Sequence, residues 1–176
     1  FLFSRMIWDK GIKEYIDAAL NIFAQFPSTH FYLVGGSDSG NPTGIPLSWL
    51  KNINKLLGVS WIDYVDDVKP WLVSADIVVL PSLYREGIPL SLLEAASFEK
   101  PIITADGPGC KEIVKNKVNG ILVPPGDSSA LESAMKYLLD NRDIWKKMGS
   151  EGRKLVLDKF DEKLIVKETI RLYNKI

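Results

Sequence analysis

Scarce cysteine and histidine, together with a balanced charge, limit what this chain can be. Its 176 residues include one cysteine and one histidine, so no internal disulfide can form and no clustered cysteine–histidine metal site is expected. Lysine plus arginine number 22, as do aspartate plus glutamate, and the formal net charge is zero. Because no overall basic field exists, we expect no nucleic-acid partner, and any anion must be bound at a local site.

Long apolar runs and internal repeats are missing as well. No stretch approaches the roughly 18 apolar residues that span a bilayer. The chain opens on a strand-like run, Phe1 to Ser4, rather than on a charged and apolar leader. Apolar residues make up 46% and charged residues 25%, as in ordinary globular domains. We therefore expect one domain, cut from a longer protein.

Short apolar runs alternate with segments of helical periodicity. The runs predict strands at 1–4, 31–34, 59–62, 77–80, 101–104 and 120–123, and helices are predicted at 12–23, 47–57, 69–74, 90–98, 110–115, from about 129, and at 143–160 and 162–175. Ser129 and Glu132 have the spacing of a capping box. Strands that are apolar throughout are typical of parallel sheets covered on both faces. The sequence predicts an α/β fold: a Rossmann-like parallel sheet of about six strands, helices on both faces and a helical C-terminal tail.

The loop after Leu80 carries the densest set of candidate groups. Ligands of such sheets bind where strands end and loops lead into helices. Glu86 precedes the next helix and Glu94 lies inside it, with Gly87 and Pro89 at the turn between them. The two carboxylates are too far apart in sequence for a tight dyad, so we expect two separate contacts with one ligand. Glu94 has an alternative interpretation, because an acid in a first turn stabilises a helix without any ligand; Glu86 has little structural reason to stand there.

Two cations follow the first strand. Arg5 and Lys10 precede the first helix, so both can point into the same cleft and neutralise a diphosphate. Taken alone, they are better interpreted as solvated surface cations. Gly36, in a glycine pair after the second strand, would let a ligand touch the backbone.

Together these residues resemble the nucleotide-sugar-binding domain of retaining family-4 glycosyltransferases, which have the two-domain GT-B fold. The resemblance rests on Glu86 and Glu94 within Glu-Gly-x-Pro-x-x-Leu-Leu-Glu-Ala, and on Arg5 with Lys10-Gly11. It covers essentially the whole chain, since the segments at 76–82, 101–104, 108–114 and 119–127 also match.

The resemblance implies a role for each candidate residue. Arg5 and Lys10 would bind the donor diphosphate and support the leaving group. Glu86 would contact the donor sugar near the reacting carbon, and Glu94 would hold the ribose hydroxyls. The other donor contacts would come from Gly36, Tyr64, Val65, Gly87, Ile88, Pro89, Leu90 and Ser91.

The implied activity is transfer of a sugar from a UDP- or GDP-linked donor, with retention of configuration, in the synthesis of bacterial surface polysaccharide or glycan. Residues 1–176 would form the donor-binding domain and would be inactive alone. An absent N-terminal domain would bind the acceptor, a glycan or lipid-linked sugar. No cofactor or metal is expected, and the parent enzyme would be cytoplasmic, near the inner face of the membrane. Two alternatives stay open: a GT-B-type sugar-nucleotide epimerase, and a non-catalytic nucleotide-sugar-binding module.

Overall fold

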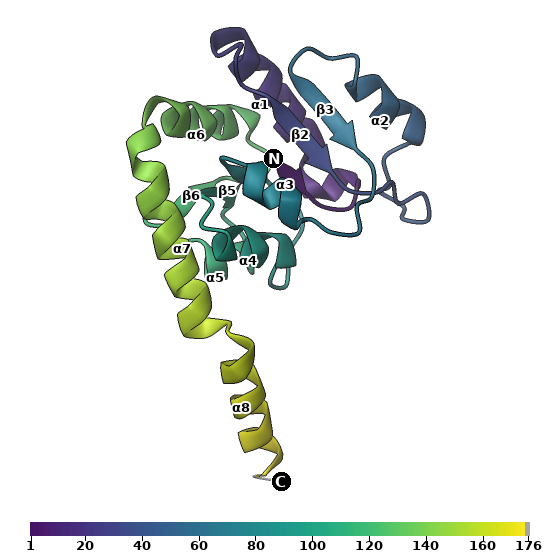
Figure 1. Cartoon of the computed structure of the whole chain (residues 1–176). Helices are drawn as coiled ribbons and strands as arrows, with labels where there is room; N and C mark the ends of the chain where they lie inside the picture. The colour runs from purple at the N-terminus through teal and green to yellow at the C-terminus, as the bar shows by residue number, and fades with distance from the viewer. Residues whose placement is uncertain (175–176) are drawn as a thin grey trace.

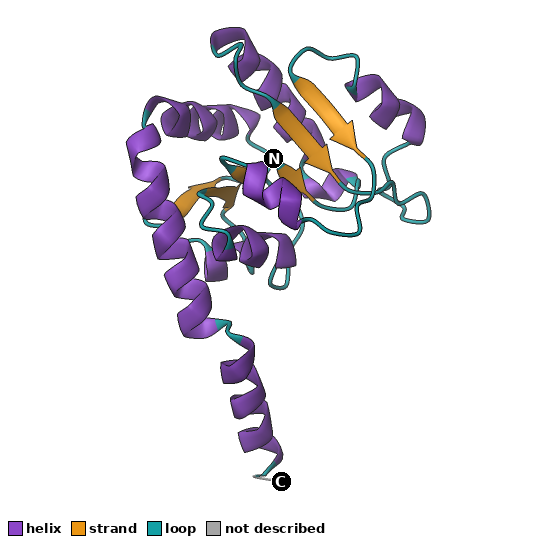
Figure 2. Cartoon of the chain, viewed as in Figure 1, coloured by secondary structure: helices purple, strands orange, loops and turns teal. Residues whose placement is uncertain are grey.

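The computed structural model describes residues 1–174, which contain six short parallel strands. These are β1 (Leu2–Phe3), β2 (Phe31–Val34), β3 (Val59–Ile62), β4 (Val78–Leu80), β5 (Ile102–Ala105) and β6 (Gly120–Val123). They form two three-stranded sheets, in the orders β1-β2-β3 and β4-β5-β6 (Figure 2). The sheets meet at Phe1, whose backbone nitrogen donates to the Ile77 carbonyl at 2.9 Å and whose carbonyl accepts from Val79 N–H at 2.8 Å. β1 and β4 are therefore neighbours, and the strands follow the Rossmann order 3-2-1-4-5-6.

Eight helices connect and follow these strands within the described residues. They are α1 (Ile12–Gln25), α2 (Leu47–Ile53), α3 (Lys69–Ser74), α4 (Leu90–Ser97), α5 (Cys110–Ile113), α6 (Ser128–Asp140), α7 (Trp145–Lys159) and α8 (Glu162–Tyr173), with 3₁₀ turns η1 (Trp8–Lys10) and η2 (Arg142–Ile144). α1 packs beside α6, and α4 beside α7 (Figure 1).

Successive side chains of each strand point to opposite faces and build two cores. On β1, Leu2 packs into the core that includes α1, α2 and α6, whereas Phe3 packs into the core that includes α3, α4 and α5. Val79 and Val78 divide in the same way on β4. Because both faces are covered, the strands are apolar throughout, and the predicted α/β parallel sheet is confirmed.

The carboxyl ends of β1 and β4 mark the point where the strand order reverses. The chain leaves β1 into residues 4–11 and leaves β4 into residues 81–89, so these loops lie next to each other. Leu83 N–H donates to the Asp9 carbonyl at 2.8 Å and joins them directly. Doubly wound sheets bind ligands in the crevice at this switch point. The topology thus selects the same two loops as the sequence.

Two helices end earlier than predicted because asparagine side chains bind the backbone beyond them. α2 stops before residue 57, since Asn54 accepts a hydrogen bond from Trp61 N–H at 2.6 Å and donates to the Trp61 carbonyl at 3.3 Å. α5 stops before residue 115, where Asn119 accepts from Lys115 N–H at 2.6 Å. Both contacts join residues that the periodicity of a single helix does not reveal.

The capping box predicted at the start of α6 is wrong. The cap is Asp127, whose side chain accepts from Ala130 N–H at 2.8 Å, and the helix begins at Ser128. Glu132 does not reach back to the helix start; it accepts from Asn21 of α1 at 2.9 Å. Glu132 therefore takes part in a contact between α1 and α6 instead of the predicted capping box with Ser129.

The predicted helical tail is present, and its last helix leaves the domain. α8 extends away from the other elements and has no buried residue (Figure 1). The predicted end at residue 175 lies outside the described residues. Across residues 1–174, none of the helices has both the length and the apolar character needed to cross a membrane.

Candidate functional site

An ion pair joins the two loops at the switch point. Lys10 Nζ lies 2.5 Å from Glu86 Oε1, and the two side chains are 16% and 11% exposed. Lys10 ends η1, just after β1, and Glu86 lies in the loop after β4. Removing one partner would leave the other charge poorly solvated, which is destabilising. Glu86 therefore has a structural partner that the sequence did not reveal.

Two glycines allow the backbones of these loops to approach closely. Gly11 has φ +73°, and a Cβ there would lie 2.1 Å from the Pro81 carbonyl oxygen. Gly109, in the loop after β5, has φ +77°, and its Cβ would lie 1.4 Å from the Gly87 carbonyl oxygen. Any side chain at either position would push the loops apart. The absence of a side chain at Gly109 thus allows the loop after β5 to lie against the Glu86–Gly87 backbone.

A buried serine contacts the same carboxylate. Ser82 is 2% exposed, and its Oγ lies 2.6 Å from Glu86 Oε1 and 3.2 Å from the Asp9 carbonyl oxygen. Sequence reasoning placed Ser82 within a matching segment but gave it no role. The sequence feature that could have indicated a role is the position of Ser82 directly after Pro81, at the carboxyl end of a strand.

Arg5 is paired with a different carboxylate. Its Nη1 donates to Asp38 Oδ2 at 2.8 Å, and the arginine side chain is 64% exposed. Asp38 lies in the loop between β2 and α2 and was missed by sequence reasoning, because the loop composition carries no signal for it. Exposed ion pairs contribute little stability, so a phosphate could replace Asp38 as the partner of Arg5.

The loops after β2 and β3 bring Gly36 and Tyr64 together. A Cβ at Gly36 would lie 3.3 Å from Cβ of Tyr64, and the Gly36 carbonyl accepts from Met6 N–H at 3.0 Å. The Tyr64 ring is exposed, so its face is available for stacking. Val65 is half-buried and packs against the core under α3.

The turn into α4 presents mostly exposed residues. Pro89 is buried and is the N-cap of α4. The first helical residue is Leu90. Gly87, Ile88 and Leu90 are exposed, and a Cβ at Gly87 would meet no atom within 4 Å. Ser91 is half-buried in the first turn.

Two titratable groups near this turn have shifted pKa values. Partial desolvation raises the pKa of Glu94, an exposed residue whose carboxylate has no hydrogen-bond or ion-pair partner among the described residues. Burial also raises the pKa of the Cys110 thiol, despite a hydrogen bond with Thr104. Cys110 is therefore a protonated, buried residue of α5 rather than an activated thiol. Within residues 1–174, no three His, Cys, Asp or Glu side chains are grouped as a metal site requires.

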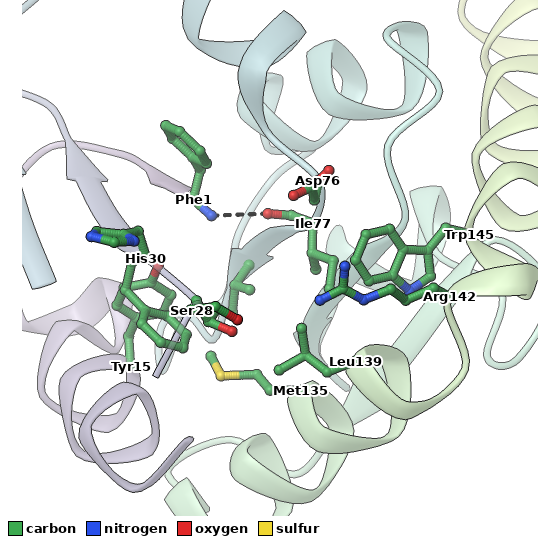
Figure 3. Close-up of a pocket in the computed structure, with 13 residues that line it drawn as sticks. Phe1, Tyr15, Ser28, His30, Asp76, Ile77, Met135, Leu139, Arg142 and Trp145 are labelled. Carbon is green, nitrogen blue, oxygen red and sulfur yellow. Dashed lines mark hydrogen bonds between the residues drawn. The ribbon is translucent and has the colours of Figure 1, made fainter. Parts of the chain in front are cut away.

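A cavity of about 360 Å³ lies at the opposite end of the sheet (Figure 3). The residues that line it include Phe1, His30 and Asp76, which lie at or beside the amino ends of β1, β2 and β4. Arg142 of η2 lines it as well. Because parallel sheets of this type bind ligands at their carboxyl ends, this cavity is not the candidate donor site.

A family model described as glycosyl transferases group 1 matches residues 1–141. The chain belongs to this family. Curated relatives include an N,N'-diacetylbacillosaminyl-diphospho-undecaprenol alpha-1,3-N-acetylgalactosaminyltransferase of Campylobacter jejuni, 29% identical over 99% of this chain and 44% of the relative. The capsular polysaccharide biosynthesis glycosyltransferase CapM of Staphylococcus aureus is 28% identical over 97% of this chain and 44% of its own length. The chain thus spans less than half of these relatives.

Solved glycosyltransferase structures share the fold. HepE of Anabaena, crystallised with UDP, superposes with a TM-score of 0.88 at 24% identity, over 99% of this chain and 48% of HepE. The C-terminal domain of the group 1 glycosyltransferase LpcC from Francisella tularensis gives 0.79 at 24% identity, over 92% of this chain and 85% of that domain. The fold is therefore that of the C-terminal half of a GT-B glycosyltransferase.

Proposed function

We propose that residues 1–176 bind a nucleotide-diphosphate sugar for a glycosyltransferase that retains the anomeric configuration. The observation that carries this proposal is the Lys10–Glu86 pair at the switch point, the place where doubly wound sheets bind nucleotides. HepE, a structural neighbour, has been crystallised with UDP-glucose, which supports a nucleotide-sugar donor for this chain. The chain itself would be the donor half, and a second domain would bind the acceptor.

Each loop would supply one part of the donor site. Lys10 and Arg5 would neutralise the diphosphate as the bond to the sugar breaks, because cations near the departing oxygen stabilise its developing charge. Glu86 would lie beside the reacting carbon, and Glu94 would accept hydrogen bonds from the ribose hydroxyls. The amides at 87–91 would meet sugar and phosphate, and Gly36, Tyr64 and Val65 would surround the nucleoside.

The acceptor is proposed to be a growing glycan or a lipid-linked sugar. The Campylobacter relative is named for a diphospho-undecaprenol-linked sugar, and the Staphylococcus relative for capsular polysaccharide biosynthesis. A lipid-linked acceptor would place the enzyme in the cytoplasm at the inner face of the membrane.

Calorimetric titration of the 176-residue chain tests donor binding. UDP, GDP and their glucose and mannose conjugates are titrated separately, and transfer to added acceptors is assayed in parallel. We expect binding to at least one nucleoside diphosphate, without transfer, because the acceptor half is missing. Absence of binding to every nucleotide, or robust transfer by the chain alone, contradicts the proposal.

Kinetics of the longer enzyme test the two glutamates. Glu86→Gln should mainly lower turnover, because a carboxylate beside a developing positive centre matters most in the transition state. Glu94→Gln should mainly raise the Michaelis constant for the donor. If turnover survives Glu86→Gln and is lost with Glu94→Gln, these roles are reversed.

A further inference from the structure

We propose that Ser82 is a positioning residue that fixes the Glu86 carboxylate, so that Oε1 is held by the protein and Oε2 is left for the donor. This inference rests on the proposed function, in which Glu86 contacts the donor sugar. Ser82 itself is almost fully buried and does not reach the donor. Its effect would pass through Glu86.

The hydrogen-bond geometry favours Glu86 as the acceptor of the Ser82 hydroxyl proton. Ser82 Oγ lies 2.6 Å from Glu86 Oε1 and 3.2 Å from the Asp9 carbonyl oxygen, and a hydroxyl donates only one proton. A separation of about 2.5–2.7 Å is typical of a hydroxyl that donates to a charged carboxylate. The Asp9 carbonyl already accepts from Leu83 N–H at 2.8 Å, so it does not depend on Ser82.

Both donors reach the same oxygen of Glu86. Lys10 Nζ lies 2.5 Å from Oε1, the atom that Ser82 also contacts, and no described residue donates to Oε2. Two donors on one oxygen fix both the position and the rotation of the carboxylate. The second oxygen is then free to accept from a sugar hydroxyl or to face a developing positive charge.

Apart from the backbone contacts of Leu83 and Gly87 already described, the surrounding loop provides little restraint. Leu83, Tyr84 and Arg85 are exposed, and a Cβ at Gly87 would meet open space. A glutamate in such a loop would otherwise populate several rotamers and would have to be ordered when the donor binds. Ser82 and Lys10 supply that order in advance, which is how preorganised groups favour a transition state.

Side-chain NMR of the 176-residue chain tests this positioning without any nucleotide. In Ser82→Ala, the three-bond couplings of the Glu86 side chain should shift toward the averaged values of a freely rotating side chain, because the hydrogen bond that fixes its carboxylate is removed. Ser82→Thr, which keeps the hydroxyl, should restore the wild-type couplings. The matched control is Thr104→Val, which removes another fully buried hydroxyl, one that donates to the Leu80 carbonyl at 2.7 Å, and leaves Glu86 untouched.

Two outcomes of the NMR experiment overturn the proposal. Glu86 couplings that are unchanged in Ser82→Ala show that the serine does not order Glu86. An equal change of the Glu86 couplings in Thr104→Val shows that a general loss of stability, rather than a specific contact, frees the side chain.

Binding of UDP and UDP-glucose then connects Ser82 to the donor. In Ser82→Ala, UDP-glucose affinity should fall by about three- to tenfold while UDP affinity stays near wild type, because only the sugar contacts Glu86. Equal losses for both ligands overturn the proposal. If wild type binds neither ligand, the proposed function fails for uridine donors, and the Glu86 couplings still decide whether Ser82 positions Glu86.

Discussion

Lys10 and Glu86 form an ion pair of 2.5 Å at the switch point of the sheet, although 76 residues separate them in sequence. Each residue lies in a loop that follows a different central strand, and β1 and β4 are neighbours through the backbone of Phe1. The carboxylate therefore holds the cation that is proposed to bind the diphosphate. A bound donor would place a second anion beside the same ammonium.

A double-mutant cycle measures this pair directly. Lys10→Met should lower the free energy of unfolding by about 1–3 kcal/mol, because it leaves Glu86 charged and poorly solvated. Glu86→Gln should cost less, since the amide oxygen still accepts from Lys10. The double variant should be more stable than the sum predicts, as urea denaturation would reveal. Strictly additive changes would mean that the two side chains do not interact in solution.

Asp38→Asn should strengthen diphosphate binding. Asp38 competes with phosphate for Arg5, and exposed ion pairs contribute about 0.2–1 kcal/mol. UDP affinity should rise by roughly 1.4- to 5-fold at low ionic strength and less at high salt. Asp140→Asn, which removes the same charge from an exposed pair with Lys136, is the control. Equal effects of the two variants would assign the change to net charge instead of to Arg5.

Gly109→Ala should destabilise the chain and displace the Glu86–Gly87 segment. Its φ of +77° costs a non-glycine residue about 1–2 kcal/mol, and the new Cβ would overlap the Gly87 carbonyl. Gly107→Ala, two residues earlier, should be nearly neutral, because a Cβ there meets nothing within 4 Å. Thermal unfolding and nucleotide titration of both variants check this. Similar stability for the two alanine variants would refute the close approach.

Nucleotide affinity should depend on pH through Glu94. Ribose hydroxyls donate to an ionised carboxylate, so affinity falls as the pH drops through the pKa of Glu94. Because burial raises that pKa, the loss should begin at a higher pH than for an ordinary carboxyl group. Calorimetric titrations with UDP between about pH 4 and 7 would measure it. In Glu94→Gln, UDP affinity should depend less on pH. If the variant keeps the pH dependence of wild type, Glu94 does not contact the ribose.

Without nucleotide, the stability of the chain should change with pH in the opposite direction to nucleotide affinity. This measurement serves as the control. A raised pKa means that the folded chain binds the Glu94 proton more tightly than the unfolded chain does. Wild type should therefore gain stability relative to Glu94→Gln as the pH falls, and lose it as the pH rises through the raised pKa.

The sequence alone determined the element order, because that order depends on local patterns. Four-residue apolar runs bounded by glycine or proline located the strands, and β2, β3 and β6 begin and end as predicted. The spacing of Glu86 and Glu94 around a helix start also led to the family that the comparison supports. Errors arose at α2, α5 and α6, where side chains such as Asn54 and Glu132 bind residues beyond their own helix.

Tertiary structure alone decided which of these residues meet. The strand order 3-2-1-4-5-6 makes β1 and β4 neighbours, and only this adjacency brings Lys10 to the oxygen of Glu86 that Ser82 contacts from within the same loop. The neighbouring pairs β1–β2 and β4–β5 likewise bring Arg5 to Asp38 and Gly109 to the Gly87 carbonyl. Hydrophobic periodicity shows only which face of a single helix or strand is buried. These contacts instead require two loops, distant in sequence, to converge where parallel strands end.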